Sequence, residues 1–329
     1  MKSAIVHNNR RQRFAFLWIL IPCFTALESY EQRFETSSFV VPVSMKAETV
    51  PKIIHQTWKT NKLPENLKFC QESFLRFHRD KGWEYRLWDD VLLYNFVNDH
   101  CPSIARLSYN LTIQFVDAAR YCVLYHVGGI FVDLDYQAFQ SLDYIFDKYG
   151  NNHGAILTIE PPNHARTFQI DFIVSNAVMF ARKNSKFFKK VIQALPVAQH
   201  YIASSMPGMS MDKIVMHTTG PLFLSHISKL FLCNANFAAN QFLQLKPGCD
   251  YSYTMKTIGK KKVAHDERNK LMIIANHHHF SSKSLFTKDG QLAEKARCVF
   301  DKDNKINTDN SEIVAKHHWC GSWWQEVGK

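Results

Sequence analysis

The sequence lacks the features that mark several classes of non-globular protein. Glycine occurs 12 times and proline 11 times in 329 residues, which excludes a collagen-like chain. Neither an internal repeat nor a low-complexity tract is present. With 46% hydrophobic and 21% charged residues, the composition also excludes a disordered chain or a coiled coil. The chain is therefore long and apolar enough to form one large or two small globular domains.

A strongly basic region is also missing, although the chain carries a net charge of +11. No basic run is longer than Lys260–Lys262, and the other basic residues are scattered. A nucleic-acid-binding protein would carry a basic stripe or a known motif, but there is no zinc-finger spacing, RRM-like signature or basic heptad. We expect no nucleic-acid partner, and the net charge weakly favours an anionic surface or substrate.

The eight cysteines show no CxxC pair or other metal-ligand spacing, so we expect no cysteine-based metal site. Seven of them follow Cys23, and in an oxidising compartment some could pair. Their spacing in the sequence does not show which cysteines pair with each other. Cys122 falls on the apolar face of a predicted helix, and we interpret it as an ordinary core residue.

Long apolar runs are scarce, and the one of note lies near the N-terminus, at residues 14–27. Basic residues from Lys2 to Arg13 precede it, and a polar segment follows from Glu28. This order keeps the N-terminus in the cytosol and sends the rest of the chain across the membrane. A helix of this length spans about 21 Å, less than the roughly 30 Å hydrocarbon core of a bilayer. A cleaved signal peptide therefore remains an alternative to a signal-anchor.

These segments predict the domain organisation. We expect a cytosolic tail, a signal-anchor or signal peptide, a stem or linker, and one folded domain, at residues 1–13, 14–27, 28–49 and 50–329. Because no second apolar run approaches twenty residues, the folded domain should be soluble and lumenal. The anchor predicts a single-pass type II protein of the Golgi or ER membrane.

From Val50 onward, strand-like and helix-like patterns alternate. Residues 52–58 form a short β-favouring run, residues 65–78 carry apolar side chains at helical spacing, and residues 83–88 alternate like a strand. Asp89 and Asp90 then offer an N-cap to the next helix. This rhythm predicts an α/β fold with a mostly parallel sheet flanked by crossover helices. Further strands are predicted at 155–159 and 177–180, and a helix beginning at Pro221.

The segment with most chemical information starts with a predicted helix over residues 111–127. Apolar side chains recur there every three or four residues, and Gly128 and Gly129 mark its end. Asp117 and Arg120 are three positions apart and share one helical face. The sequence therefore predicts an acid and a guanidinium side by side, just before the next strand.

That next strand is predicted over residues 130–135, and side-chain alternation would deliver Asp133 and Asp135 to the same side. The carboxyl end of a strand in an open α/β sheet is where ligands bind. Paired carboxylates suit a hard cation such as Mn²⁺ or Mg²⁺, which can bridge to phosphate oxygens. Such a metal neutralises the charge that grows on a departing nucleoside diphosphate. Two acids at this spacing also occur in solvated turns, but the preceding helix, glycine pair and strand favour the metal site.

Five segments occur in an order that resembles a known family: residues 51–58, 117–121, 128–135, 219–221 and 317–324. The chain resembles, over residues 50–329, the glycosyltransferases with a DxD-containing sugar-binding region, glycosyltransferase family 32. This family includes initiating α-1,6-mannosyltransferases and inositol phosphorylceramide mannosyltransferases. Residues 175–179 and 219–225 are most similar to the inositol phosphorylceramide enzymes, and the closing segment to the family at large.

The resemblance implies a GT-A type, Rossmann-like fold with a nucleotide-sugar donor and a divalent metal. It also implies transfer of a hexose, with retention of configuration, by a catalytic domain at residues 50–329. Mannose from GDP-mannose is favoured as donor, and a glycan or a glycolipid like inositol phosphorylceramide as acceptor. UDP-linked galactose, N-acetylglucosamine or glucose remain alternatives, as do a nucleotide-sugar hydrolase and an inactive binding protein of the secretory pathway.

The resemblance also implies roles for single residues. Trp58 would lie near the nucleotide base, with an ordinary core aromatic as the alternative. Asp117 and Arg120 would bind the donor, with a surface ion pair as the alternative. Asp133 would contact the sugar or ribose and the metal, and Asp135 would bind the metal directly.

The closing segment would complete the site. Ser322 and Trp324 would close over the diphosphate, and Ser322 or His318 would complete the metal shell, although His317 is not distinguished from them. A surface tail is the alternative. The run of His277, His278 and His279 cannot converge on one ion from a strand, so we expect a loop or strand end there. Asn176 either faces the acceptor or packs in the core.

Two positions depart from the family pattern. Val116 stands where serine is usual, and residues 183–188 replace a loop of the family. Since acceptor loops often lie at the second position, the identity of the acceptor stays open.

Overall fold

The computed structural model describes most of the predicted folded domain. Its described residues are 49–233, 255–258, 261–266, 271–274, 279–282 and 312–320. All of them belong to one unit of the chain, Ala47–Lys329. The predicted tail, the predicted anchor and nearly all of the predicted linker lie outside the described residues. Within the described ranges, no helix has both the length and the apolar character needed to cross a bilayer.

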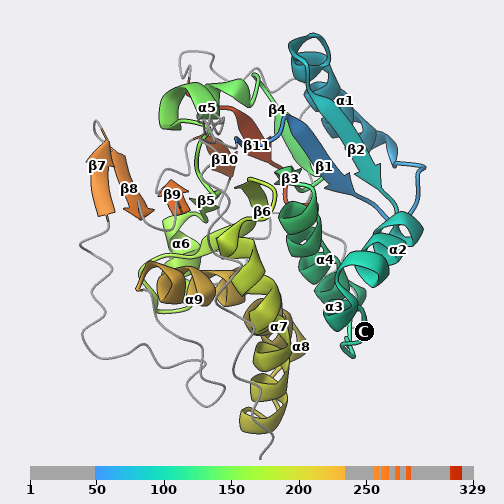
Figure 1. The fold of residues 1–329 in the computed structure, drawn as a ribbon, viewed down its shortest axis with the longest axis vertical. Coiled ribbons are helices and arrows are strands. Elements are labelled where there is room, and N and C mark those ends of the chain that lie inside the picture. Colours follow the sequence, from blue (N-terminus) through green and yellow to red (C-terminus); the bar gives the residue numbers. More distant parts are fainter. Residues whose placement is uncertain are drawn as a thin grey trace, which may run out of the picture. The chain divides into compact units, whose positions relative to one another are not determined.

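The main sheet has eight strands in the described residues, in the order β2-β1-β3-β6-β5-β9-β8-β7 (Figure 1). Their bounds are β1 Ile53–Thr57, β2 Glu84–Trp88, β3 Gly129–Val132, β5 Ala155–Ile159, β6 Val174–Ala181, β7 Met255–Ile258, β8 Lys261–Asp266 and β9 Leu271–Ile274. Strand β6 is antiparallel to β3 and β5, and β8 is antiparallel to β9 and β7, whereas the other neighbours are parallel. All the described strands of this sheet except β6 and β8 therefore run the same way, which confirms the predicted mostly parallel sheet.

A smaller sheet brings the C-terminal part of the described chain back to the middle of the sequence. It contains β10 (Phe280–Ser282), β11 (Ala315–His317) and β4 (Tyr136–Ala138), in that order. Strand β11 is parallel to β10 and antiparallel to β4, with His317 opposite Tyr136. Because β4 begins directly after Asp135, this register places His317 next to the paired acids.

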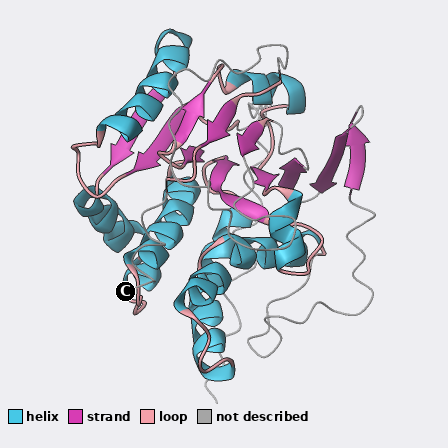
Figure 2. Cartoon of the chain, turned by 180° about the vertical axis from the view of Figure 1, so that it is seen from behind, coloured by secondary structure: helices cyan, strands magenta, loops and turns pink. Residues whose placement is uncertain are grey.

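Helices flank the main sheet, as the α/β prediction requires (Figure 2). They are α1 Glu65–His78, α2 Asp90–His100, α3 Pro102–Ala105, α4 Thr112–His126, α5 Asp143–Tyr149, α6 Pro162–Thr167, α7 Lys186–Ser205, α8 Met211–Thr218 and α9 Pro221–Leu232. The predicted helix at 65–78 is confirmed as α1. Asp89 caps α2 as predicted, since its side chain accepts a hydrogen bond of 2.8 Å from the backbone N–H of Leu92.

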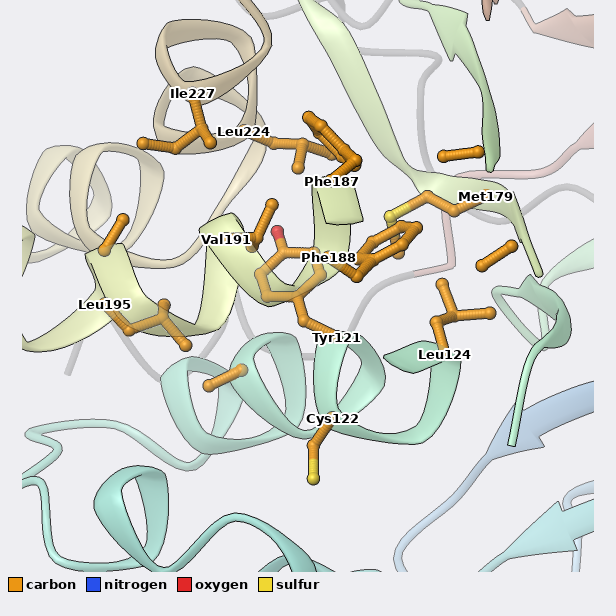
Figure 3. Close-up of a cluster of buried hydrophobic side chains, with 14 of the residues drawn as sticks. Tyr121, Cys122, Leu124, Met179, Phe187, Phe188, Val191, Leu195, Leu224 and Ile227 are labelled. Carbon is orange, nitrogen blue, oxygen red and sulfur yellow. The ribbon is translucent and has the colours of Figure 1, made fainter. Parts of the chain in front are cut away.

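The core forms on both faces of the sheet because side chains alternate along each strand. Phe131 of β3 joins a cluster with buried residues of α4, α7 and α9, whereas Ile130 and Val132 join a cluster with residues of α1 and α5. In the first cluster, Tyr121 of α4 stacks on Phe188 of α7 with 6.2 Å between ring centroids (Figure 3). Full burial of a large apolar side chain stabilises the fold by about 1.5–3 kcal/mol. Helix α4 is thereby fixed against the sheet at the point where its polar residues meet the site.

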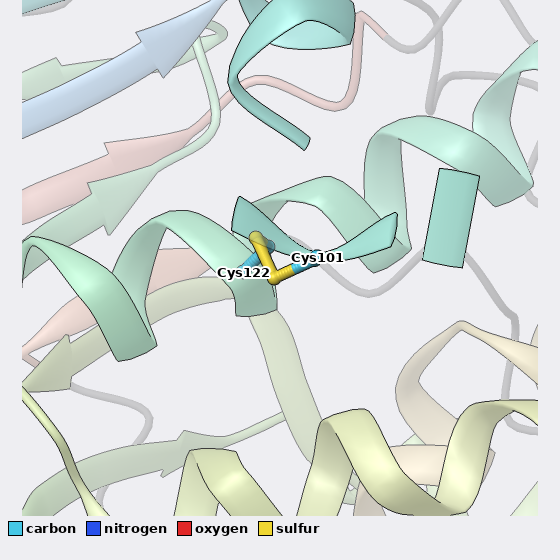
Figure 4. The surroundings of a disulfide bond; sticks show 2 residues. All are labelled: Cys101 and Cys122. Atoms are coloured by element: carbon cyan, nitrogen blue, oxygen red, sulfur yellow. A yellow bond between two sulfur atoms is a disulfide. The ribbon is translucent and has the colours of Figure 1, made fainter. Parts of the chain in front are cut away.

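A disulfide joins Cys101, at the start of α3, to Cys122 in α4 (Figure 4). The interpretation of Cys122 as an ordinary core residue was wrong in this respect, because α3 packs on α4 and brings the two sulfur atoms together. Cys233 and Cys320 are disulfide-bonded as well, whereas Cys70 is a buried free thiol.

Candidate active site

Gly128 and Gly129 lie where α4 gives way to β3, and both have backbone angles that other residues rarely adopt. The φ angle is +75° at Gly128 and +97° at Gly129. A Cβ atom on Gly129 would lie 2.6 Å from the backbone oxygen of Ile53 in β1. The glycine pair therefore ends the helix, as predicted, and also allows β3 to pass close to β1.

Strand β3 ends earlier than predicted, at Val132. Asp133 follows the strand, and its carbonyl oxygen accepts a hydrogen bond of 3.2 Å from the N–H of Tyr136, which closes a turn containing Asp135. The prediction that a strand over 130–135 aligns the two acids by alternation was therefore wrong. It is the turn at the carboxyl end of β3 that brings Asp133 and Asp135 together.

Asp117 and Arg120 of α4 form a buried cluster with Asp133. One guanidinium nitrogen of Arg120 (Nη2) lies 3.1 Å from Oδ1 of Asp117, and the other (Nη1) lies 2.8 Å from Oδ1 of Asp133. Asp117 and Arg120 are only 4% and 3% exposed, so the alternative of an ordinary surface ion pair was wrong. Helix α4 packs against β6 and α8, which cover much of this face of the helix.

Further hydrogen bonds hold this cluster in place. Asn176 of β6 donates to Asp117 Oδ1 (3.0 Å), and its backbone oxygen accepts from Arg120 Nη1 (2.8 Å). The hydroxyl of Thr219 donates to Asp117 Oδ2 (3.3 Å). Nε of Arg120 has no hydrogen-bond partner among the described residues, although it is buried. A buried guanidinium with a spare donor can bind a phosphate or sugar oxygen.

Burial also changes the protonation of Asp117. It raises the pKa of this carboxyl group to about 7, although Arg120 opposes the shift. An acid with such a pKa in a cavity is a candidate for a functional residue.

A second cluster contains Asp133, Asp135 and His317. Nε2 of His317 lies 3.0 Å from Oδ1 of Asp135, and one ligand atom from each of the three residues lies within 4.8 Å of the others. Burial would lower the pKa of His317, but the neighbouring Asp135 carboxylate raises it above its ordinary value. Two carboxylates and an imidazole fit Mn²⁺ well, and they fit Mg²⁺ through their oxygen atoms.

The neighbouring His318 takes a different position. Its backbone N–H donates to the carbonyl oxygen of Asp135 (3.0 Å), and its Nε2 lies 3.1 Å from Oε1 of Gln137. The described residues thus bring His317, and not His318, into the group with Asp133. The sequence alone did not show which of the two histidines faces the acids. That is decided by the pairing of β11 with β4, which are far apart in the sequence.

Both clusters line one cavity of about 250 Å³. Trp58 also lines it, directly after β1 and only half buried, which agrees better with a ligand contact than with a core position. Asn176 lines the cavity as well, so packing and ligand contact are compatible for this residue. Glu160 and His164 lie on the wall too, and nothing in the sequence had indicated them, since each stands alone in its segment.

Several predicted residues fall outside the described part of the chain. These are Ser322 and Trp324, and also His277 and His278. His279 is described and buried, with a ring nitrogen 2.8 Å from the hydroxyl of Tyr149.

One segment of the chain matches a known protein family. Residues 64–152, which include Asp117, Arg120 and both acids of the turn, match the family described as "Glycosyltransferase sugar-binding region containing DXD motif". The resemblance found in the sequence is therefore confirmed for this segment.

The chain is also similar to individual proteins, two of which are mannosyl-transferring enzymes by name. The chain is 36% identical over 181 residues to inositol phosphoceramide mannosyltransferase 2 of Schizosaccharomyces pombe. The matched region covers 54% of this chain and 46% of that protein. It is 33% identical over 205 residues to mannosyl phosphorylinositol ceramide synthase CSH1 of Saccharomyces cerevisiae, covering 61% and 48%. The chain thus spans about half the length of the curated relatives it matches. Among solved structures, galactosyltransferase LgtC aligns with 51% of this chain and 70% of its own at 12% identity and a TM-score of 0.34, too low to support a conclusion.

Proposed function

We propose that this protein is a retaining, metal-dependent mannosyltransferase of the GT-A type. It transfers mannose from GDP-mannose to a glycolipid like inositol phosphorylceramide. The observation that carries this proposal is the pair of clusters in one cavity, in which Asp133 belongs both to the Arg120 cluster and to the group with His317. The names of the relatives, which include a mannosyltransferase and a mannosyl phosphorylinositol ceramide synthase, support the sugar and the acceptor.

Asp133, Asp135 and His317 would hold the metal, Mn²⁺ or Mg²⁺. Bound there, it would neutralise the negative charge that develops on the diphosphate as the sugar leaves. The turn between β3 and β4 and the β11 register fix these three side chains before any ligand arrives, which is the preorganisation that electrostatic catalysis needs.

The donor would be oriented by residues around this group. Trp58 offers an aromatic face to the nucleotide base at the end of β1. Arg120 offers its guanidinium to a phosphate or sugar oxygen, and Asp117 accepts a sugar hydroxyl, since both residues line the cavity. Ser322 and Trp324 belong to the same proposal as groups that close over the diphosphate.

Transfer with retention requires attack from the side that the diphosphate leaves. The bond between the anomeric carbon and the phosphate oxygen breaks, and a bond to the acceptor oxygen forms. The acceptor's proton passes to the departing phosphate oxygen, so no protein base is needed. The role of the protein is to exclude water and to hold the acceptor hydroxyl on the face of the sugar that the diphosphate leaves.

The direct test is a transfer assay with the full chain in detergent, GDP-mannose, Mn²⁺ and inositol phosphorylceramide. We expect a mannosylated lipid, detected by mass spectrometry. Asp135→Ala should lower the rate by at least about a hundredfold. Asp80→Ala, which removes an exposed acid outside the cavity, should leave the rate unchanged. Activity of Asp135→Ala near that of the control would refute the metal role.

The rival functions give different results in this assay or in a measurement of the melting temperature with nucleotide sugars. A hydrolase releases free mannose at the same rate with and without the lipid. An enzyme that uses a UDP-sugar is stabilised against heat by UDP-sugars and Mn²⁺, because a ligand that binds the folded state raises its melting temperature. An inactive binding protein has a higher melting temperature with a nucleotide sugar but forms neither mannosylated lipid nor free sugar.

The proposed location is the lumenal side of the Golgi or ER membrane, with residues 14–27 as the anchor. The test is extraction of membranes from cells that express the full chain. An anchored protein stays with the membrane at alkaline pH, whereas a protein with a cleaved signal peptide is released.

A further inference from the structure

The wall of the cavity carries a further buried acid, Glu160, outside the two clusters described above. It follows β5 directly, is 9% exposed, and its N–H donates to the carbonyl oxygen of Ile173 (2.8 Å). Its Oε2 lies 3.0 Å from Nδ1 of His164, which is 4% exposed and belongs to α6. Ser175 of β6 also hydrogen-bonds to the carboxylate. The carboxylate of Glu160 is therefore held in one orientation by side chains of α6 and β6.

Strand β6 separates Glu160 from the donor cluster. Strands β3 and β5 run the same way on either side of β6, so their carboxyl ends lie at one edge of the sheet. The N–H of Asp133 donates to the carbonyl oxygen of Ala177 and that of Glu160 to the carbonyl oxygen of Ile173, so the two ends are also offset from each other along β6. At the start of β6, Asn176 bonds to Asp117, and its neighbour Ser175 bonds to Glu160. Consecutive residues of β6 thus bond to the Arg120 cluster and to Glu160.

The charge at the Glu160 end indicates the chemistry of its ligand. Burial would raise the pKa of Glu160, but the hydrogen bond and charge of His164 hold it below the ordinary value. An ionised carboxylate accepts hydrogen bonds from hydroxyl groups and repels phosphate. Glu160 is also absent from the metal-binding group among the described residues. The diphosphate therefore belongs at the Arg120 end, and a hydroxyl-bearing ring at the Glu160 end.

An aromatic side chain completes this end of the cavity. Trp319 lines the cavity between the two ends, with its ring centroid 5.3 Å from that of His164 and 3.9 Å from that of His317. Its φ of +54° is unusual for a residue other than glycine, and such backbone strain is found at functional sites. The half-buried indole of Trp319 offers an apolar surface to a ring, and the carboxylate of Glu160, bonded to His164, offers an acceptor to its hydroxyls.

We propose that Glu160, positioned by His164, and Trp319 form the subsite that binds the hydroxyl-bearing ring of the acceptor. The ligand class is a polyol ring, such as the inositol of the lipid head group, with one hydroxyl bonded to Glu160 while another faces the sugar. This inference rests on the proposed transferase function.

The test compares Glu160→Gln with wild type in three measurements on the full chain in detergent. These are transfer of mannose to inositol phosphorylceramide, hydrolysis of GDP-mannose without acceptor, and the melting temperature with GDP, Mn²⁺ and myo-inositol 1-phosphate. The matched control is Glu72→Gln, which makes the same chemical change on the exposed side of α1. Glu160→Asp keeps the charge and serves as a second variant if Glu160→Gln does not fold.

For Glu160→Gln we expect the acceptor KM to rise at least about tenfold, because a charge-assisted hydrogen bond is lost. The donor KM and the acceptor-free hydrolysis should stay within about twofold of wild type, since donor contacts are intact. In the presence of GDP and Mn²⁺, myo-inositol 1-phosphate should raise the melting temperature of wild type and of Glu72→Gln. It should not raise the melting temperature of Glu160→Gln. Glu160→Asp should give intermediate values.

Three results would overturn the subsite. They are an unchanged acceptor KM in Glu160→Gln, a fall in hydrolysis as large as the fall in transfer, and head-group stabilisation equal to wild type. Failure of the proposed function has a different signature. Wild type would then be stabilised by the head group but would form no mannosylated lipid.

Discussion

Nε2 of His317 lies 3.0 Å from Oδ1 of Asp135, although the two residues come from distant parts of the chain. The contact exists because β11 pairs with β4, which begins one residue after Asp135. It places an imidazole beside two carboxylates and separates the adjacent histidines into different roles. His317 faces the acids, and His318 bonds to Gln137.

Replacing His317 should therefore weaken metal binding. In His317→Ala we expect the dissociation constant for Mn²⁺ to rise at least about tenfold, since loss of a metal-site partner commonly costs this much or more. Calorimetric titration of the protein with Mn²⁺ in the presence of GDP measures it. His318→Ala is the matched control and should bind Mn²⁺ as wild type does. An equal loss of Mn²⁺ affinity in both variants would show that His317 does not bind the metal.

Asp117 should be important for stability as well as for donor binding. A surface ion pair, the alternative that the sequence left open, could be removed at little cost, but Asp117 is buried and paired with Arg120. Asp117→Ala should lower the free energy of unfolding by about 3 kcal/mol, because it breaks a buried pair. Asp117→Asn keeps polar contacts to Asn176 and Thr219, so its free energy of unfolding should fall by less. Urea denaturation distinguishes the two, and equal, small losses would contradict this account.

The Cys101–Cys122 disulfide should stabilise the packing of α3 on α4. Its loop spans a sequence separation of 21 residues. A loop of this size predicts a loss of about 3 kcal/mol when the bond is removed. Cys101→Ala and the double variant with Cys122→Ala should therefore lose similar amounts in urea denaturation. A loss below about 1 kcal/mol would show that α3 is held by packing alone.

Acid should destabilise the fold through His55 in β1. The ring is buried between Gly128, whose carbonyl oxygen lies 2.9 Å from Nε2, and Trp88, whose indole N–H donates to Nδ1 (3.1 Å). Burial lowers the pKa of His55 to about 4 from an ordinary value of 6.5. Below pH 6.5 the unfolded chain binds a proton that the folded protein does not bind until about pH 4, so stability falls as the pH falls through this window.

At pH 4.5 the contribution of His55 to this loss should be about 2–3 kcal/mol. The measurement is the free energy of unfolding in urea at pH 7 and pH 4.5, for wild type and for His55→Gln. Other buried histidines contribute to both proteins, and the difference isolates His55. The variant should lose less stability than wild type on acidification. Equal losses would show that His55 is not the group that titrates.

Local patterns were sufficient to predict most of the elements around the site. The spacing of apolar residues predicted α1 at Glu65–His78, and the glycine pair predicted the end of α4. The end of β3 was misplaced because Asp133 and Asp135 favour a turn as much as they fit an alternating strand. Local periodicity cannot distinguish the two.

What the sequence could not predict depends on contacts between distant segments. Asp117 is buried because β6 and the segment around Thr219 cover it, and helical spacing alone made it equally compatible with the surface. Cys122 pairs with Cys101 because α3 packs on α4. Glu160 carries no motif, and only the shared edge of β3 and β5 brings it to the cavity.

The most direct test of the metal site is anomalous diffraction at the manganese edge, from crystals grown with Mn²⁺ and GDP. We predict one strong peak within bonding distance of Asp133, Asp135 and His317, with the diphosphate on its open side. A peak elsewhere, or a bound GDP whose phosphates contact no metal at these residues, would contradict the account.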